Sequence, residues 1–270
     1  MASALTLVCV HAHPDDESLF TAGITSHYAD LGHRVVLITC TNGQLGFDEN
    51  ARPGSDPTHD VEVTRAARAS ELQRAATVAG FSRVVTLGYD DSGMKGWAQN
   101  GSSNAFMNAD VSAVARTIAS IMDEERASVV VTYDENGFYG HPDHIMANVV
   151  TRAALKLATS PQRLYYPVAP KSVFEEFVTG ARAMDVFLPA WILEAGHTVS
   201  DDVVSTTMDV RSAAKRKHQA IATHASQVDN ADLVTMDEEL FTLLFGIEYY
   251  QRAWSRDVTS GDETDLFGGL

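Results

Sequence analysis

The segment LTLVCVHAHPDDES, residues 5–18, runs from a short apolar stretch directly into a group of histidines and carboxylates. Its first half, Leu5–Val10, predicts a buried β-strand, because it is short, rich in Leu and Val and bounded by polar residues. Proline is well tolerated in the first turn of a helix, and Asp15, Asp16 and Glu17 suit the positive end of a helix dipole. The segment therefore predicts a strand whose carboxyl end leads through a histidine-rich turn into a helix.

The same alternation of strand and helix continues along the first two thirds of the chain. Further strands are predicted over Val35–Thr41, Val84–Leu87 and Val129–Tyr133, and helices over about 18–31, 61–79, 110–125 and 143–158. Such alternation predicts a Rossmann-like α/β fold, with a mostly parallel sheet, right-handed crossovers and helices on both faces. Because parallel strands of an open sheet carry their sites beyond their carboxyl ends, the site is expected there.

The last third, about 160–270, is less regular. It predicts a strand over Leu164–Val168, a helix over Arg211–Thr223 and a strand or helix end over Glu248–Trp254. The polar tail is expected to be ordered only if Leu266 and Phe267 dock on the core. Because no internal repeat or clear linker interrupts the chain, we expect residues 1–270 to form one domain whose last third helps to build the substrate pocket.

The overall charge limits the class of partner. With a formal net charge of −16, the chain lacks the basic surface that nucleic acid or an anionic membrane would require. No early apolar run is long enough to span a bilayer, and the first positive side chain is Arg34, so a cytoplasmic protein is expected. Cys9 and Cys40 fall in predicted buried strands and are expected to pack rather than to form a disulfide. The sequence does not decide whether the protein forms a homo-oligomer.

A second histidine motif, GHPDH at residues 140–144, follows the fourth predicted strand. In both motifs the candidate ligands are three residues apart and so share a helix face: His13 with Asp16, and His141 with His144. A histidine before a proline is often only a helix cap, but two such motifs at neighbouring strand ends predict one metal site. Catalytic zinc keeps three protein ligands, which leaves the fourth candidate, or Asp15, for acid–base work.

These residues, together with shorter motifs in the same order, resemble the LmbE-like (PIG-L) zinc-dependent de-N-acetylase family. The motifs are AHPDDES (12–18), TCTNGQLG (39–46), RASEL (68–72), DSGM (91–94), TYDENGFYGHPDH (132–144) and HASQ (224–227). The pair AHPDDE and HPDH is highly specific, and the resemblance covers most of the chain. Within the family, the chain is most similar to the mycothiol-type acetylglucosaminyl-inositol deacetylases and mycothiol conjugate amidases.

The resemblance implies a role for each matching residue. His13, Asp16 and His144 would hold one Zn²⁺ per chain, and Asp15 would be the general base that activates the metal-bound water. His141 would assist at the leaving amine or stabilise the tetrahedral intermediate. A further residue, Tyr139, would reach the developing oxyanion, where a hydrogen-bond donor is needed.

Substrate-binding residues are also implied. Family members bind the glucosamine and its aglycone with the residues that match Arg68 and Asp91. Met94 is expected to border the substrate, and Gln44 to bond a sugar hydroxyl where the mycothiol enzymes tend to carry an acidic residue. His224 is expected either to line the pocket or to cap the end of a helix.

The expected function is hydrolysis of the N-acetyl group of an N-acylglucosamine-type substrate. The alternative is a mycothiol S-conjugate amidase that cleaves a larger amide in a thiol conjugate with the same metal site. A metal-binding sugar receptor without turnover is a weaker alternative, because binding alone needs no general base. A dinucleotide-binding oxidoreductase is rejected, since no GxGxxG follows the first strand.

Overall fold

The computed structural model describes residues 4–183, 198–257 and 263–270. Its sheet has the strand order β3-β2-β1-β4-β5-β8-β7, and β6 pairs with the end of β5. The strands are β1 (Thr6–His11), β2 (Arg34–Thr41), β3 (Arg83–Tyr89), β4 (Val129–Val131), β5 (Arg163–Pro170), β6 (Thr198–Val199), β7 (Thr206–Asp209) and β8 (Ile247–Ser255). Strands β1 to β5 are mutually parallel, whereas β8 runs antiparallel to both of its neighbours, β5 and β7. The predicted α/β fold with a mostly parallel sheet is therefore confirmed.

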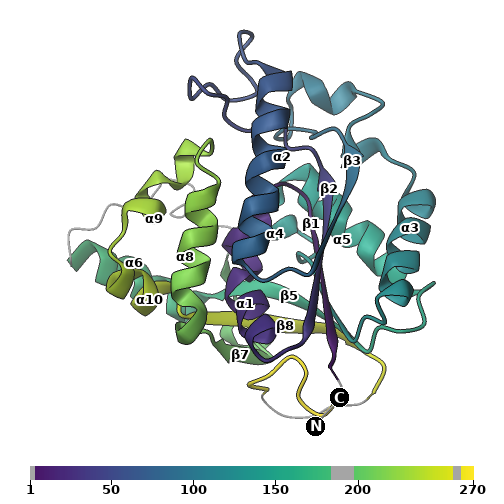
Figure 1. The fold of residues 1–270 in the computed structure, drawn as a ribbon, viewed down its shortest axis with the longest axis vertical. Helices are drawn as coiled ribbons and strands as arrows, with labels where there is room; N and C mark the ends of the chain where they lie inside the picture. The colour runs from purple at the N-terminus through teal and green to yellow at the C-terminus, as the bar shows by residue number, and fades with distance from the viewer. Residues whose placement is uncertain (1–3, 184–197, 258–262) are drawn as a thin grey trace.

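Helices cover both faces of the sheet, as Figure 1 shows, with α1, α2 and α8 on one side and α3 and α5 on the other. The α-helices are α1 (Ala22–Asp30), α2 (Val61–Val78), α3 (Val111–Glu124), α4 (Gly137–Gly140), α5 (Pro142–Leu155), α6 (Lys171–Ala183), α8 (Ala214–Thr223), α9 (Ala231–Thr235) and α10 (Glu238–Phe245). Shorter helical turns are the π-helix η1 (Glu17–Thr21) and the 3₁₀ turns η2 (Ala98–Gly101), η3 (Phe106–Asn108), η4 (Asp201–Val203), η5 (Arg211–Ala213) and η6 (Val228–Asn230).

The central strand β1 is buried along its whole length, because successive side chains point to opposite, equally covered faces. Val8 and Val10 pack in the core below α3 and α5, and Leu7 and Cys9 pack in the core below α1 and α2. Cys9 and Cys40 are both free and fully buried, as the sequence predicts for packing residues.

The last third of the chain adds a layer beside the sheet. In Figure 1, α6, α9 and α10 lie next to α8, away from the α3 and α5 side. Ile221, Leu233 and Phe241 form a small apolar cluster there, separate from the two cores of the sheet. Leu266 and Phe267 are buried, and Phe267 packs against the ring of Tyr28 with 4.4 Å between ring centroids, so this part of the tail docks.

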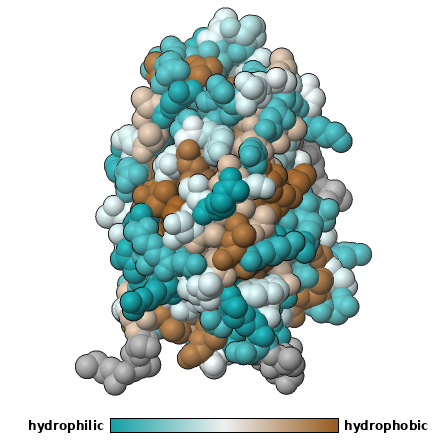
Figure 2. Space-filling view, turned by 90° about the vertical axis from the view of Figure 1, so that its right-hand side faces the viewer, coloured by the Kyte–Doolittle hydropathy of each residue, from teal (hydrophilic) through white to brown (hydrophobic). Residues whose placement is uncertain are grey.

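Within the described residues, no helix is long and apolar enough to cross a membrane. Figure 2 shows the face that lies on the right of Figure 1. Its apolar side chains form patches interrupted by polar ones.

Candidate active site

The first histidine motif forms an irregular turn between β1 and the π-helix η1. Asp15 adopts a φ of 118°, a conformation that is rare outside glycine. A π-helix is uncommon and is frequently found at functional sites. The helix predicted from residue 18 is therefore two pieces, η1 and α1, joined where the chain leaves the site.

The second motif forms the start of α5. His141 is the N-cap residue, and its Nδ1 accepts a hydrogen bond from the backbone N–H of Asp143 at 3.1 Å. Pro142 occupies the first helical turn, where its missing donor costs nothing. This local structure points His141 and the buried His144 towards the end of β1, and the His13 and His141 rings lie 4.5 Å apart between centroids.

Three of the candidate metal ligands meet with a regular spacing. His13 Nδ1 lies 3.3 Å from His144 Nε2 and 3.4 Å from Asp16 Oδ2. His144 Nε2 lies 3.4 Å from Asp16 Oδ1. All three side chains are at least nine-tenths buried.

Tyr133 contacts two of these candidate ligands, Asp16 and His144, and fixes their positions. Its hydroxyl donates to Asp16 Oδ2 at 2.7 Å, and its ring stacks on that of His144 with 3.9 Å between centroids. The backbone N–H of His13 also donates to Asp16 Oδ2, at 2.7 Å. Since Oδ2 already accepts two hydrogen bonds, Oδ1 of Asp16 is the oxygen left for another partner.

The other nitrogen of His13 faces two further carboxylates. Its Nε2 lies 3.2 Å from Asp143 Oδ2 and 3.6 Å from Asp91 Oδ1. Asp143 is fully buried and also accepts from the backbone N–H of Ser92 at 2.8 Å. Burial lowers the pKa of His13, but Asp91, Asp143 and Asp16 outweigh burial and raise that pKa well above its ordinary value.

Asp15 is held through both its carboxylate and its backbone. Arg68 Nη2 lies 2.9 Å from Asp15 Oδ1, and the backbone N–H of Asp15 donates to Glu17 Oε2 at 3.0 Å. Glu17 Oε1 in turn contacts His224 Nε2 at 2.7 Å, and both of these side chains are fully buried. Burial raises the pKa of Asp15 to about 7, although the Arg68 guanidinium opposes the rise, and a cation bound by the adjacent ligands would oppose it further.

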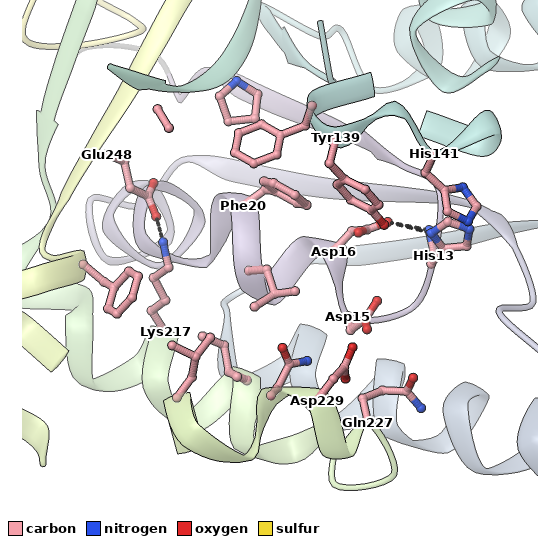
Figure 3. A pocket seen from close by; sticks show the side chains of 18 of the residues that line it. His13, Asp15, Asp16, Phe20, Tyr139, His141, Lys217, Gln227, Asp229 and Glu248 are labelled. Carbon is pink, nitrogen blue, oxygen red and sulfur yellow. Dashed lines mark hydrogen bonds and ion pairs between the residues drawn. The ribbon is translucent and has the colours of Figure 1, made fainter. Parts of the chain in front are cut away.

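These groups line one end of a cavity of about 660 Å³. Asp15, Tyr139 and His141 also line this end, and Figure 3 shows them beside His13 and Asp16. Tyr139 is 39% exposed, and its ring meets that of His144 edge-on at 4.9 Å between centroids.

The residues expected to bind substrate are placed differently from one another. Arg68, Asp91 and Met94 line the cavity, but Arg68 is also engaged by Asp15 and by the carbonyl of Gly43. Gln44 and His224 are not among the described residues that line the cavity. The Oε1 atom of Gln44 accepts from the backbone N–H of Asp91 at 3.1 Å, and His224 contacts Glu17.

Several polar residues of the site were not predicted from the sequence. Asp143 could have been found, because HPDH repeats HPDD with Asp143 in the place of Asp15. Glu17 belongs to the AHPDDES motif, yet its contact with Asp15 depends on the π-helix. Tyr133 lies in the motif TYDENGFYGHPDH, yet its contact with Asp16 depends on the fold, and Asp229 and Asn230 carry no local signal because only the fold brings them to the cavity.

Taken together, a carboxylate beside a cluster of buried histidines and carboxylates, at the carboxyl edge of a parallel sheet, defines a metal-dependent hydrolase of the α/β class. Comparison with known sequences agrees. Residues 8–155 match the PIG-L family, described as GlcNAc-PI de-N-acetylase. The chain is 36% identical to the 1D-myo-inositol 2-acetamido-2-deoxy-alpha-D-glucopyranoside deacetylase of Acidothermus cellulolyticus, over 98% of this chain and 95% of that protein.

The chain therefore belongs to the PIG-L family of de-N-acetylases, and it is an enzyme that hydrolyses a carbon–nitrogen bond.

Solved structures share the fold at low sequence identity. An N,N'-diacetylchitobiose deacetylase from Pyrococcus horikoshii is 17% identical with a TM-score of 0.55, over 93% of this chain and 83% of that one. A 4-carboxy-2-hydroxymuconate hydratase from Pseudomonas putida is 16% identical with a TM-score of 0.63, over 95% of this chain and 99% of that one. Because a hydratase has the same fold, the fold alone does not fix the reaction.

Proposed function

We propose that this protein is a zinc-dependent deacetylase that removes the acetyl group from a 2-acetamido-2-deoxyglucoside. The observation that carries the proposal is the spacing of His13, Asp16 and His144 next to the carboxylate of Asp15. The names of the full-length relatives support the substrate class.

The three residues fit a zinc ion. A tetrahedral ion with ligands at roughly 2.0–2.1 Å sets those ligands about 3.3–3.4 Å apart. His13 Nδ1 and His144 Nε2 lie 3.3 Å apart, which is this spacing, and Asp16 lies beside both, with Oδ2 at 3.4 Å from His13 Nδ1 and Oδ1 at 3.4 Å from His144 Nε2. When bound, the ion would supply Lewis acidity towards the amide carbonyl and would lower the pKa of a water molecule.

Two other groups of ligand atoms compete for His13. They are His13, His141 and His144, and His13, Asp91, His141 and Asp143. We favour the set with Asp16 over the group of His13, Asp91, His141 and Asp143. That group would use Nε2 of His13, which faces Asp143 Oδ2, and this oxygen already accepts a hydrogen bond from the backbone N–H of Ser92. In this assignment Asp143 is the partner that orients His13 and fixes its tautomer.

The chain's other side chains then have separate tasks. Asp15 takes the proton of the attacking water, and its neighbours Arg68 and Glu17 fix its direction. His141 moves a proton to the leaving amine. The Tyr139 hydroxyl donates to the developing oxyanion from the cavity wall.

Sugar recognition is assigned to the polar wall near Asp15. Asp91, Asp229, Asn230 and Gln227 line this part of the cavity. Because sugar hydroxyls lose free energy when they are buried without partners, these carboxylate and amide groups are the natural contacts for the ring.

The test is acetate release from N-acetylglucosamine and from an N-acetylglucosaminyl-inositol. The purified protein is assayed with added zinc, after chelation, and after zinc is restored. Release that requires zinc is the expected result. A folded, zinc-loaded protein that releases no acetate but cleaves a cysteinyl thiol conjugate would contradict the proposal and favour an amidase.

We also propose that residues 1–270 work as one domain. The parallel strand β5 pairs on one side with β4 and on the other with β8 from the last third. The cavity likewise draws its wall from both parts of the chain. A single cooperative unfolding transition, seen by two different probes, is the expected outcome.

A further inference from the structure

A row of three buried polar side chains leads to Asp16, and none of the three is among the described residues that line the cavity. The three are Tyr133, His11 and Thr21, and each is fully buried. The Tyr133 hydroxyl lies 2.7 Å from Asp16 Oδ2 and 3.1 Å from His11 Nδ1. On the other side of the imidazole, His11 Nε2 lies 3.0 Å from Thr21 Oγ1. Because the proposed reaction uses none of the three directly, the row needs an explanation of its own.

Three separate elements bring this row together. His11 is the last residue of β1, Thr21 is the last residue of η1, and Tyr133 follows β4, the strand beside β1. The contact between His11 and Tyr133 spans 122 residues, and their rings meet edge-on at 5.4 Å between centroids. The row therefore depends on the fold, and it holds both nitrogens of a buried imidazole.

The Tyr133 hydroxyl has one proton and two possible acceptors. Its oxygen accepts from the backbone N–H of Ala12 at 2.9 Å, since an amide nitrogen can only donate. The proton itself can go to Asp16 Oδ2 or to His11 Nδ1, but not to both. Which of the two receives it depends on where the imidazole of His11 carries its own proton.

A neutral imidazole has one N–H, and the two tautomers of His11 give different results. With the proton on Nδ1, His11 donates to the Tyr133 oxygen, the hydroxyl donates to Asp16, and every contact of the hydroxyl is satisfied. With the proton on Nε2, the Nδ1 atom becomes an acceptor that competes with Asp16 for the hydroxyl. One of those two contacts is then left without a proton.

The charge of Asp16 decides between the tautomers. A hydrogen bond to a carboxylate is roughly twice as strong as one between neutral groups, and a buried carboxylate is costly to leave unpaired. The Tyr133 proton therefore goes to Asp16, and His11 carries its proton on Nδ1. Thr21 completes the arrangement by donating to His11 Nε2 rather than to the carbonyl of Glu17 at 3.1 Å, because Thr21 is the only described group that bonds Nε2.

We propose that His11 is a positioning residue for the metal site, which turns the Tyr133 hydroxyl towards Asp16 Oδ2 and so leaves Oδ1 as the single oxygen that binds metal. This inference rests on the proposed function, in which Asp16 is a ligand. Oδ2 accepts from the Tyr133 hydroxyl and from the backbone N–H of His13, both at 2.7 Å. Without the first of these bonds, Oδ2 is free to bind the metal as well, since it lies only 3.4 Å from His13 Nδ1.

Removing the donor should weaken metal binding. His11→Leu is expected to lower the affinity for zinc about tenfold to 100-fold, the usual loss when a partner of a metal ligand is removed. Thr21→Val leaves His11 in place but removes the donor to Nε2, so the affinity should fall in the same direction. His11→Asn should restore most of the affinity, because its amide nitrogen can take the place of Nδ1 as the donor.

Thr39→Val is the matched control. Thr39 is the register partner of His11 on β2, it is fully buried, and its hydroxyl bonds no described group. This variant should keep the zinc affinity of the wild type. An equal loss of affinity in Thr39→Val and His11→Leu would show that any change in this part of the core weakens the site, and would overturn the proposal.

Two readouts separate positioning from packing. Cobalt bound in place of zinc absorbs visible light more weakly as its coordination number rises, so His11→Leu should weaken the absorption and His11→Asn should restore it. In a Tyr133→Phe protein, adding His11→Leu should cost no further affinity, because His11 acts only through the hydroxyl. Full additivity of these two substitutions would overturn the proposal. If His11→Leu does not fold, Thr21→Val carries both tests.

The metal measurements also separate this inference from the proposed function, because they need no acetate release. A protein that binds zinc, loses affinity in His11→Leu and releases no acetate would support the positioning role and contradict the deacetylase. Equal zinc affinity in wild type, His11→Leu and Thr21→Val would overturn the positioning role, while zinc-dependent acetate release would still support the deacetylase.

Discussion

Replacing Glu17 by Gln tests whether the proposed general base depends on the residue behind it. Glu17 accepts from the backbone N–H of Asp15 at 3.0 Å, from Ser18 Oγ at 2.6 Å and from His224 Nε2 at 2.7 Å. Gln keeps the shape of the side chain but turns one acceptor oxygen into a donor. The NH₂ group of Gln therefore faces another donor in at least one of these contacts, or that contact no longer involves a charged carboxylate.

The size of the effect follows from the kind of hydrogen bond that is lost. A hydrogen bond to a charged group contributes about 1.5–3 kcal/mol, and Asp15 depends on this one because its φ of 118° is otherwise unfavourable. If that free energy is lost in the transition state, kcat falls about ten- to 150-fold. Because Glu17 contacts none of the three proposed ligands in these bonds, the affinity for zinc should change little.

The assay follows acetate release with kcat and KM separated, alongside zinc affinity by competition with a chelator and Tm by calorimetry. Glu125→Gln is the matched control. Glu125 is 9% exposed and pairs with Arg34 and Arg83 at the amino ends of β2 and β3, the edge opposite the site. Both variants should lower Tm, but only Glu17→Gln should lower kcat. A Glu17→Gln protein with a wild-type kcat would refute the reasoning.

Further predictions concern the metal and the response to pH. Zinc at 100 times its Kd should stabilise the protein by roughly 2.7 kcal/mol, a Tm rise of about 5–10 °C that a chelator reverses in calorimetry. His13→Ala should show neither this rise nor acetate release, and a normal zinc-induced shift would exclude His13 as a ligand. The Arg34 guanidinium holds the pKa of Glu125 below its usual range. The stability from Glu125 is therefore complete above the unfolded pKa, about 4.3, and is lost as the pH falls through the folded pKa. The Tm gap between wild type and Glu125→Gln should accordingly narrow below about pH 4.3, and a gap that widens would contradict the assignment.

The fold was predictable where the chain follows simple periodicity. Leu5–Val10 is apolar on both faces, and the structure places it as β1 in the middle of the sheet. The antiparallel pairing of β7 and β8 was not predictable, because β8 alternates only partly between buried and exposed residues. Its partner β5 is fixed by packing between distant parts of the chain rather than by local pattern.

Part of the site was likewise predictable from the sequence, and part was not. Pro14 and Pro142 mark the two motifs in the sequence, and parallel strands bring the motifs to one edge. By contrast, the contact of His224 with Glu17 spans 207 residues and depends on where α8 ends. The sequence left His224 either lining the pocket or at the end of a helix, and the structure places it at the C-cap of α8, in contact with the residue that holds Asp15.

The central claim is that Asp15 drives hydrolysis beside a metal held by other residues. Acetate release is therefore compared between wild type and Asp15→Asn at equal, measured zinc content. We expect Asp15→Asn to bind zinc as wild type does and to lose about 10²- to 10⁴-fold in kcat. A zinc-replete Asp15→Asn protein that releases acetate at the wild-type rate would contradict the claim.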